Sequence, residues 1–178
     1  AGYAATQVKI DAAAVWCALE AEGTVYLGTG DDGRLLAMSG NRVREIARFD
    51  AVMVTSLAWG AGVLYAGTMP KGLVYAIDRK GRWREFTRLA AEHVWALHWD
   101  RGVLYAATGP NGKLFAIDSS GKSRVHHDSD EKHLLSLAPA PGGLYVGSGD
   151  GAILYRVDRG GGAFAVRDFD GDELRALS

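Results

Sequence analysis

Residues 102–118, with the sequence GVLYAATGPNGKLFAID, decide how this chain folds, because near copies of them recur along its length. Two short runs rich in Val, Leu, Tyr and Phe flank a turn of Gly, Pro and Asn, and this pattern predicts a β-hairpin. The other copies are GTVYLGTGDDGRLLAM (23–38), GVLYAGTMPKGLVYAID (62–78) and GGLYVGSGDGAILYRVD (142–158). Their tyrosines, Tyr26, Tyr65, Tyr105 and Tyr145, lie 39, 40 and 40 residues apart. This period indicates a repeat protein.

Each period contains four predicted strands, and together they favour an all-β fold, a β-propeller. In the third period the extended segments are residues 94–98, 103–108, 113–117 and 123–127, each bounded by Gly, Asp, Asn or Pro. No segment shows the 3.6-residue period of a helix. Short antiparallel strands that repeat every ~40 residues are typical of propellers, in which each four-stranded blade packs against its neighbours.

The repeat predicts a single propeller domain over residues 1–178, with four complete blades and one unmatched strand at each end. The predicted blades are residues 13–50, 52–90, 92–129 and 132–170, with an outer strand at 6–11 and an inner strand at 172–178. Propellers usually close by completing one blade with strands from both ends. Because the central strands of such a blade are missing, two alternatives remain: a fragment of a larger ring, which we favour, or open ends that associate with another copy.

The repeat resembles bacterial β-propeller repeats with the pattern Leu-Tyr-x-Gly-Thr-x-x-x-Gly-x-Leu-Tyr-x-x-Asp, which are relatives of the quinoprotein-like and NHL-like propellers. The resemblance covers nearly the whole chain. It implies a propeller that serves as a binding scaffold, since most members of these families are scaffolds and some are enzymes. The Thr-Gly-x-x-x-Trp motif that ordinarily follows the quinoprotein repeat is absent here. Pyrroloquinoline quinone is therefore not expected as a cofactor.

Small and hydroxyl side chains recur at fixed positions of the period. The third residue of the first strand is always small: Cys17, Ser56, Ala96, Ser136 and Ala176. This predicts a close approach of neighbouring backbones, and it makes Cys17 a structural residue and not a reactive thiol. A hydroxyl residue ends the second strand: Thr29, Thr68, Thr108 and Ser148. We expect these hydroxyls to bond to the backbone of the hairpin turn.

Composition excludes several classes of function. The chain has 20 Lys and Arg against 21 Asp and Glu, so it lacks the overall positive charge of a nucleic-acid-binding protein. No apolar run approaches the ~18 residues of a membrane span. One cysteine excludes an intrachain disulfide. No signal peptide is recognisable, so we expect a soluble protein that is either cytoplasmic or exported with its signal removed.

The segments that join one period to the next carry the candidate functional residues. In a propeller these segments share one face with the hairpin turns, at the mouth of the central channel. Here they are acidic, and two of them also carry histidine. Candidate metal ligands, for calcium or zinc, are His93, Glu92, His133, Glu131 and Glu173. Candidate partner contacts are Asp128, Asp130, Lys132, Asp170 and Asp172.

The sequence contains no catalytic motif: no nucleophile elbow, no triad spacing and no HExxH. His126 and His127 end a predicted outer strand, where we expect them to be exposed. Five tryptophans are interpreted as blade-packing and rim residues: Trp16, Trp59, Trp83, Trp95 and Trp99. We therefore expect a non-enzymatic scaffold, without a cofactor, that binds a protein or another macromolecule. The alternatives are a hydrolase or lyase with a divalent metal in the channel, and a piece with no function of its own.

Overall fold

The computed structural model describes residues 7–177, and all of their regular secondary structure is β-strand. Sixteen strands form four antiparallel sheets, each made of four consecutive strands. Blade 1 contains β1 (Val15–Ala21), β2 (Thr24–Thr29), β3 (Arg34–Ser39) and β4 (Arg42–Arg48). Blade 2 contains β5 (Met53–Gly60), β6 (Val63–Met69), β7 (Leu73–Ile77) and β8 (Trp83–Arg88). Blade 3 contains β9 (His93–Asp100), β10 (Val103–Gly109), β11 (Lys113–Ile117) and β12 (Ser123–Asp128). Blade 4 contains β13 (Leu134–Ala140), β14 (Gly143–Ser148), β15 (Ile153–Asp158) and β16 (Ala163–Asp168).

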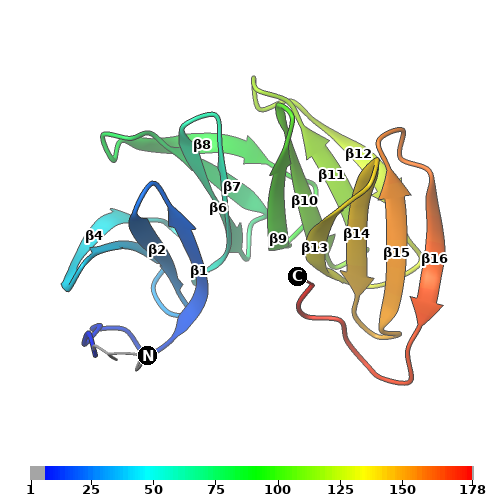
Figure 1. Ribbon diagram of the computed structural model, residues 1–178, viewed down its shortest axis with the longest axis horizontal. Coiled ribbons are helices and arrows are strands. Elements are labelled where there is room, and N and C mark those ends of the chain that lie inside the picture. Colours follow the sequence, from blue (N-terminus) through cyan, green and yellow to red (C-terminus); the bar gives the residue numbers. More distant parts are fainter. Residues whose placement is uncertain (1–6, 178) are drawn as a thin grey trace, which may run out of the picture.

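The four blades stand side by side around a common centre, with the first strand of each blade innermost (Figure 1). The inner strands contact one another in chain order: β1 with β5, β5 with β9, and β9 with β13. The outer strands β4, β8, β12 and β16 lie on the periphery. The predicted all-β propeller of four complete blades is confirmed.

The two additional end strands are not formed in the described residues. Residues 7–11 of the expected outer strand contain no strand, and residue 6 lies outside the described part. The expected inner strand at 172–178 is reduced to one bridge, between Gly149 and Glu173, and residue 178 is not described. A strand persists only where a neighbour completes its hydrogen-bond ladder.

Close approach between blades depends on pairs of small residues, as the repeat predicts. Cys17 pairs with Gly28, and a Cβ on Gly28 would lie 2.6 Å from the Cys17 sulfur and 2.8 Å from Val54 Cγ1 of the next blade. The Ser56 and Gly67 pair receives Val94 in the same way. The first buried side chain of each inner strand therefore fits into a gap that only small residues leave open.

At three of the joints, the places where an inner strand packs on the next inner segment of the chain, a polar contact accompanies this packing. The Cys17 thiol and the Ser56 hydroxyl donate to the carbonyl oxygens of Val54 and Val94, at 3.4 and 3.3 Å. Ser136 donates likewise to the carbonyl of Leu174, at 2.6 Å. Leu174 thus occupies the position of Val54 and Val94, so the C-terminal segment begins as the inner strand of a further blade would.

The environment of Cys17 supports its structural role. Burial raises the pKa of this thiol to about 12, far above neutral pH. The thiol therefore stays protonated, and the reactive thiolate form is not populated.

Hydroxyl groups bond to the hairpin turns as predicted. Thr68 Oγ1 donates to the Leu73 carbonyl at 3.0 Å, and Thr108 Oγ1 donates to the Lys113 carbonyl at 2.8 Å. Ser148 Oγ instead accepts from the Ile153 amide, at 3.0 Å. The backbone path of each turn is thereby fixed from within its own blade.

Each hairpin turn is also hydrogen-bonded to the loop that leads to the next blade. The Gly72 amide donates to the Glu92 carbonyl, and the Leu89 amide donates to the Gly72 carbonyl, both at 2.9 Å. Gly72 has a φ of 59°, and a Cβ there would collide with the Ala91 carbonyl. Ala152, with a φ of 47°, takes this place in blade 4. The turns and the interblade loops consequently form one continuous surface, which we call the loop end of the propeller.

Candidate functional site

A cavity of about 490 Å³ lies at the centre of the propeller, among the inner strands. Its walls come from all four blades and from the C-terminal segment. The lining residues are Trp16, Thr55, Trp95, His133, Leu135, Glu173 and Arg175. Trp16, Thr55, Trp95, Leu135 and Arg175 are equivalent in the repeat, because they follow the aligned residues Val15, Val54, Val94, Leu134 and Leu174. His93, His133 and Glu173 are equivalent as well, because each precedes one of these aligned residues.

Trp95 and His133 form the fixed part of this cavity. Trp95 Nε1 donates a hydrogen bond to His133 Nδ1, at 3.1 Å. The ring of His93 stacks on that of His133, with centroids 6.0 Å apart and an interplanar angle of 22°. Gly109 leaves room for this arrangement, since a Cβ there would collide with the His133 ring. Because Nδ1 accepts a hydrogen bond, the proton of the neutral His133 ring resides on Nε2.

The electrostatics of the cavity are balanced. Burial lowers the pKa of His133 below its ordinary value, which favours the neutral imidazole near pH 7. Glu173 and Arg175 form an ion pair with each other. The cavity lining therefore carries one negative and one positive charge.

The five predicted metal ligands lie in different surroundings. Within residues 7–177, no three His, Cys, Asp or Glu side chains lie where they could share a metal ion. Glu92 is exposed and lies 4.0 Å from His93 Nε2, while Glu131 Oε1 lies 3.5 Å from the Tyr155 hydroxyl. His93, His133 and Glu173 do occupy equivalent positions, but the Nδ1 lone pair of His133 is already used by Trp95.

The predicted partner contacts lie at the loop end, and most of them are solvent-exposed. Asp130, Lys132, Asp170 and Asp172 are exposed. Asp128, at the end of β12, pairs with Lys113 Nζ at 3.0 Å. Four of the five predicted contact residues are thus free of salt bridges to other described residues.

A segregation of charge between the two ends of the propeller escaped the sequence analysis. The hairpin turns and interblade loops (30–33, 49–52, 70–72, 89–92, 110–112, 129–133, 149–152 and 169–172) carry nine acidic and two basic residues. They are Asp31, Asp32, Asp50, Glu92, Asp130, Glu131, Asp150, Asp170 and Asp172, with Lys71 and Lys132. The connections at the opposite end carry six basic residues, Arg79, Lys80, Arg82, Arg101, Lys122 and Arg159, and three acidic ones, Glu22, Asp78 and Asp118. A formal charge of −1 for the whole chain conceals this difference, which a count by loop type would have found.

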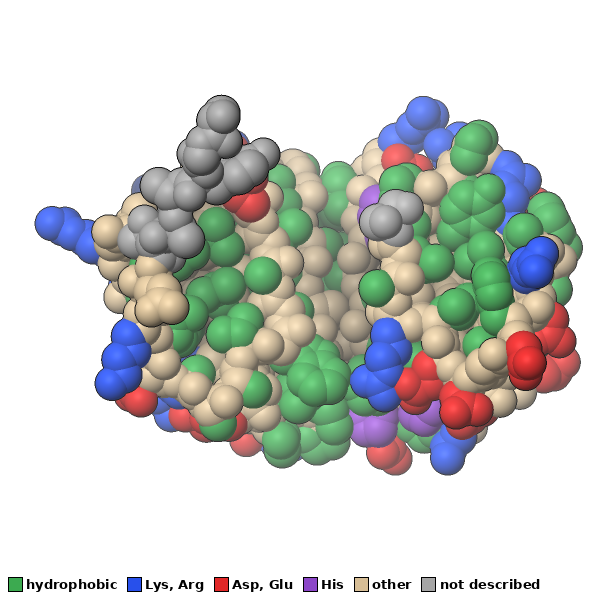
Figure 2. All heavy atoms as spheres, turned by 60° about the horizontal axis from the view of Figure 1, so that its bottom comes forward, with side chains coloured by type: hydrophobic (Ala, Val, Ile, Leu, Met, Phe, Trp, Pro, Cys, Tyr) green, Lys and Arg blue, Asp and Glu red, His purple; other side chains and the backbone are tan. Residues whose placement is uncertain are grey.

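Two of the acidic residues at the opposite end accept hydrogen bonds within their own turns. Asp78 Oδ1 accepts hydrogen bonds from the amides of Lys80 and Arg82, at 2.8 and 3.0 Å. Asp118 accepts from Ser120 and Lys122 in the same way. These hydrogen bonds hold the pKa of both carboxyl groups below the usual range. The free charge at this end is therefore positive. On the face that Figure 2 presents, carboxylates lie beside histidines along the lower edge.

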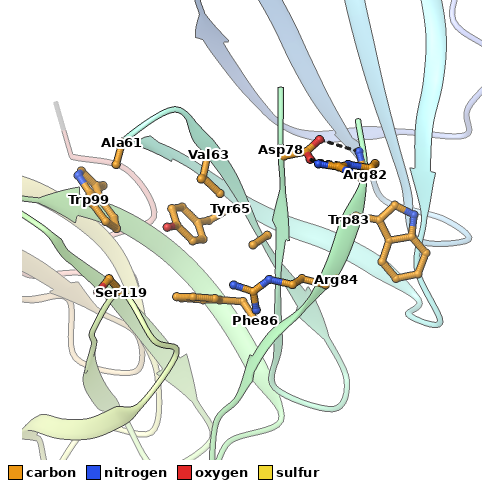
Figure 3. A pocket seen from close by; sticks show the side chains of 11 residues that line it. Ala61, Val63, Tyr65, Asp78, Arg82, Trp83, Arg84, Phe86, Trp99 and Ser119 are labelled. Atoms are coloured by element: carbon orange, nitrogen blue, oxygen red, sulfur yellow. Dashed lines mark hydrogen bonds and ion pairs between the residues drawn. The ribbon is translucent and has the colours of Figure 1, made fainter. Parts of the chain in front are cut away.

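A second cavity, of about 520 Å³, lies between blades 2 and 3 (Figure 3). Tyr65 lies between Trp99 and Phe86 in its wall, and the ion pair of Asp78 and Arg82 lies at its margin. The aromatic rings here are joint residues, which pack blade 2 on blade 3. This accords with the interpretation of Trp99 as a blade-packing residue.

The expected exposure of the His126 and His127 pair is wrong for His126. This side chain is only 7% exposed, because its ring packs on Tyr105 at the joint between blades 3 and 4. Its Nε2 lies 3.0 Å from the Asp158 carbonyl oxygen of blade 4. His127 is half-buried beside Tyr155. The repeat position was the missed signal, since His126 stands where blade 2 has Phe86.

No family model matches the sequence, and no curated protein matches it. Among solved structures, the chain is similar to virginiamycin B lyase from Staphylococcus aureus, with a TM-score of 0.77, 13% identity, and coverage of 86% of this chain and 55% of that one. It is similar to the computationally designed Ika8 protein, with a TM-score of 0.67, 18% identity and coverage of 90% and 51%. It is also similar to the computationally designed Ika4 protein, with a TM-score of 0.62, 15% identity, and coverage of 93% of this chain and 98% of that one.

The chain spans about half the length of Ika8 and of the lyase. At these identities the comparisons show the fold alone. Together with the four sheets, they show that this chain has a β-propeller-like fold.

Proposed function

We propose that this protein is a non-enzymatic β-propeller binding module whose acidic loop end docks a basic segment of a protein partner. The observation that carries this proposal is the segregation of charge, with nine acidic and two basic residues at the loop end. A surface of one sign raises the association rate of an oppositely charged partner and disfavours partners of like charge.

The rigidity of the loop end supports the same function. Backbone hydrogen bonds tie the interblade loops to the hairpin turns, as between Gly72 and Glu92 and between Gly112 and Lys132, both at 2.9 Å. Loops that are already ordered lose little conformational entropy when a partner binds.

The resemblance of the repeat to quinoprotein-like and NHL-like propellers also favours a scaffold. The thiol of Cys17 is protonated and lies between two blades, so it is not an activated nucleophile. Our proposal therefore assigns the loop end to recognition and assigns no reaction to it.

The test uses a labelled oligolysine peptide as the basic probe and an oligoglutamate peptide of the same length as its control. Fluorescence anisotropy at low ionic strength is expected to show binding of oligolysine only, and added salt is expected to weaken it. The variant Asp130→Lys/Glu131→Lys/Asp172→Lys is expected to lose about tenfold in affinity, because each exposed charge contributes a fraction of a kcal/mol.

The matched control reverses three charges at the opposite end, Arg79→Glu/Lys80→Glu/Arg101→Glu, and is expected to bind oligolysine at least as well as the parent protein. Equal loss in both variants would show that the loss does not come from the charges of the loop end, and it would overturn the proposal. Failure of oligolysine to bind the parent protein at low salt would overturn it as well.

A further inference from the structure

We propose that the central cavity binds an uncharged carbohydrate, a ligand distinct from the basic segment assigned to the loop end. The cavity of about 490 Å³ has the size of a small-molecule site, for which ~300–1,000 Å³ is usual. Its walls come from five separate segments of the chain, which is typical of a ligand site and is not needed for packing one blade on another.

Two tryptophans give the cavity its apolar surface. The only polar atom of Trp95 is bonded to His133, so this indole offers a ligand nothing but carbon surface, held in one orientation. Trp16 lies on β1, on another wall, and is left 46% exposed. Flat aromatic faces of this kind suit the C–H faces of a sugar ring, which combine weak C–H contacts with loss of hydrating water.

The polar groups form a mixed set of donors and acceptors. His133 donates through Nε2, because its Nδ1 accepts from Trp95. Glu173 uses one carboxylate oxygen, Oε2, for Arg175 Nε, which leaves Oε1 as an acceptor. The terminal nitrogens of Arg175 are further donors. A sugar hydroxyl donates and accepts at once, so neighbouring hydroxyls can be matched by a carboxylate, a guanidinium and an imidazole.

Charge balance selects against ionic ligands. A cation would have to compete with Arg175 for Glu173, and an anion would have to approach the Glu173 carboxylate. Burial keeps the imidazole of His133 neutral near pH 7. The ion pair of Glu173 and Arg175 leaves no single charge for an ionic ligand to pair with, so the site favours a ligand without charge.

The test measures binding of glucose, galactose, mannose, N-acetylglucosamine and their disaccharides by isothermal titration calorimetry. Glucuronate, glucosamine and inorganic phosphate serve as charged controls. At least one neutral sugar is expected to bind with a dissociation constant of about 1 mM or below. No binding of any neutral sugar up to about 50 mM would overturn the proposal, and so would tighter binding of a charged control.

Variants locate the site. Trp16→Ala is expected to weaken sugar binding at least tenfold, while Trp83→Ala on the outer strand β8, a tryptophan with the same 46% exposure, leaves it unchanged. Both side chains are partly exposed, and Trp83 also packs edge-on against the rings of Phe49 and Tyr75. Equal affinity of the Trp16→Ala variant and the parent protein would overturn the assignment. The three charge reversals at the opposite end are expected to leave the sugar affinity unchanged, so failure of this proposal and failure of the proposed function are distinguishable.

Discussion

The joint between blades 2 and 3 and the joint between blades 3 and 4 use the same repeat positions but fill them differently. In the first joint Tyr65 packs against Phe86 and Trp99, with ring centroids 5.1 and 5.4 Å apart. In the second joint Tyr105 packs against His126, with centroids 5.2 Å apart. His126 also makes a polar contact across the joint, to the Asp158 carbonyl.

The difference shows that this position requires a buried ring and tolerates a polar one when its nitrogens find partners. His126 Nε2 faces the Asp158 carbonyl, and its Nδ1 lies 3.2 Å from Arg124 Nη1. Burial lowers the pKa of His126, with further effects from Arg124, Asp158 and His127. The stability of the first joint is therefore independent of pH over the range in which histidine titrates, whereas the stability of the second joint depends on pH.

Truncating the aromatic joint has the largest expected effect. Phe86→Ala is expected to lower the free energy of unfolding by about 3–4 kcal/mol, because a ring that is 7% exposed leaves a cavity. Denaturant unfolding followed by circular dichroism measures this. Phe164→Ala on β16, where the ring is 56% exposed, is the control and is expected to stay within about 0.5 kcal/mol of the parent protein. A similar loss in both variants would contradict the joint as the source of the effect.

Acid is expected to weaken the second joint. The folded pKa of His126 lies below its ordinary value of 6.5, so the unfolded chain takes up a proton first as the pH falls. The stabilisation is fully present above pH 6.5 and is lost progressively below it. His98, His127 and His133 have lowered pKa values too and act in the same direction. Urea unfolding at several pH values is expected to show this loss, and the variant His126→Phe, which copies blade 2, is expected to show less of it. If the stability of the His126→Phe variant fell with pH as much as that of the parent protein, the assignment of this effect to His126 would be contradicted.

The hairpin turns are expected to contribute equally in blades 2 and 3, whatever their joints contain. Thr68→Val and Thr108→Val each remove one hydrogen bond to the backbone, so each is expected to lower the free energy of unfolding by about 1 kcal/mol. Thermal and denaturant unfolding of the two variants measure the difference. A large disparity between them would show that turn and joint energies are coupled.

The smallest expected effect is a gain in stability. Cys17, Ser56 and Ser136 each donate to the next inner strand, whereas Ala96 at the equivalent position cannot. Ala96→Ser is expected to supply the missing bond to Leu134 and to raise the free energy of unfolding by about 0.5 kcal/mol. Ser136→Ala is the reverse change, with an expected loss of similar size. Destabilisation by Ala96→Ser would show that the Ala96 and Ala107 pair leaves no room for a hydroxyl.

The sequence was sufficient for the blades because their determinants are local and repeated. A strand is recognisable from its own apolar residues, and a turn from its glycines, so four copies reinforce one prediction. The role of Thr68 and its equivalents followed from spacing alone, since the hydroxyl bonds to the carbonyl only five residues away. Likewise, the recurrence of small residues indicated close backbones before any contact between blades was known.

Contacts between blades were harder to predict because they join residues that are remote in the sequence. His126 is buried by Tyr105 and by Asp158, which lies 32 residues away, so an outer-strand position gave a misleading expectation of exposure. The hydrogen bond from Trp95 to His133 spans 38 residues. Histidines and carboxylates at equivalent positions suggested a metal site, and the rings of His93 and His133 do lie together, with centroids 6.0 Å apart. Metal binding at these positions stays a prediction.

The chain of contacts between inner strands has a consequence for how the molecule opens. Each blade packs on the blades that precede and follow it, so β5 and β9 each share two blade joints, whereas β1 and β13 each share one. Such a molecule is a row of units with nearest-neighbour coupling, and its cooperativity depends on how many joints must break. Opening blade 1 or blade 4 breaks one joint, while opening an inner blade breaks two. Amide protons in blades 2 and 3 are therefore expected to exchange with solvent more slowly than those in blades 1 and 4.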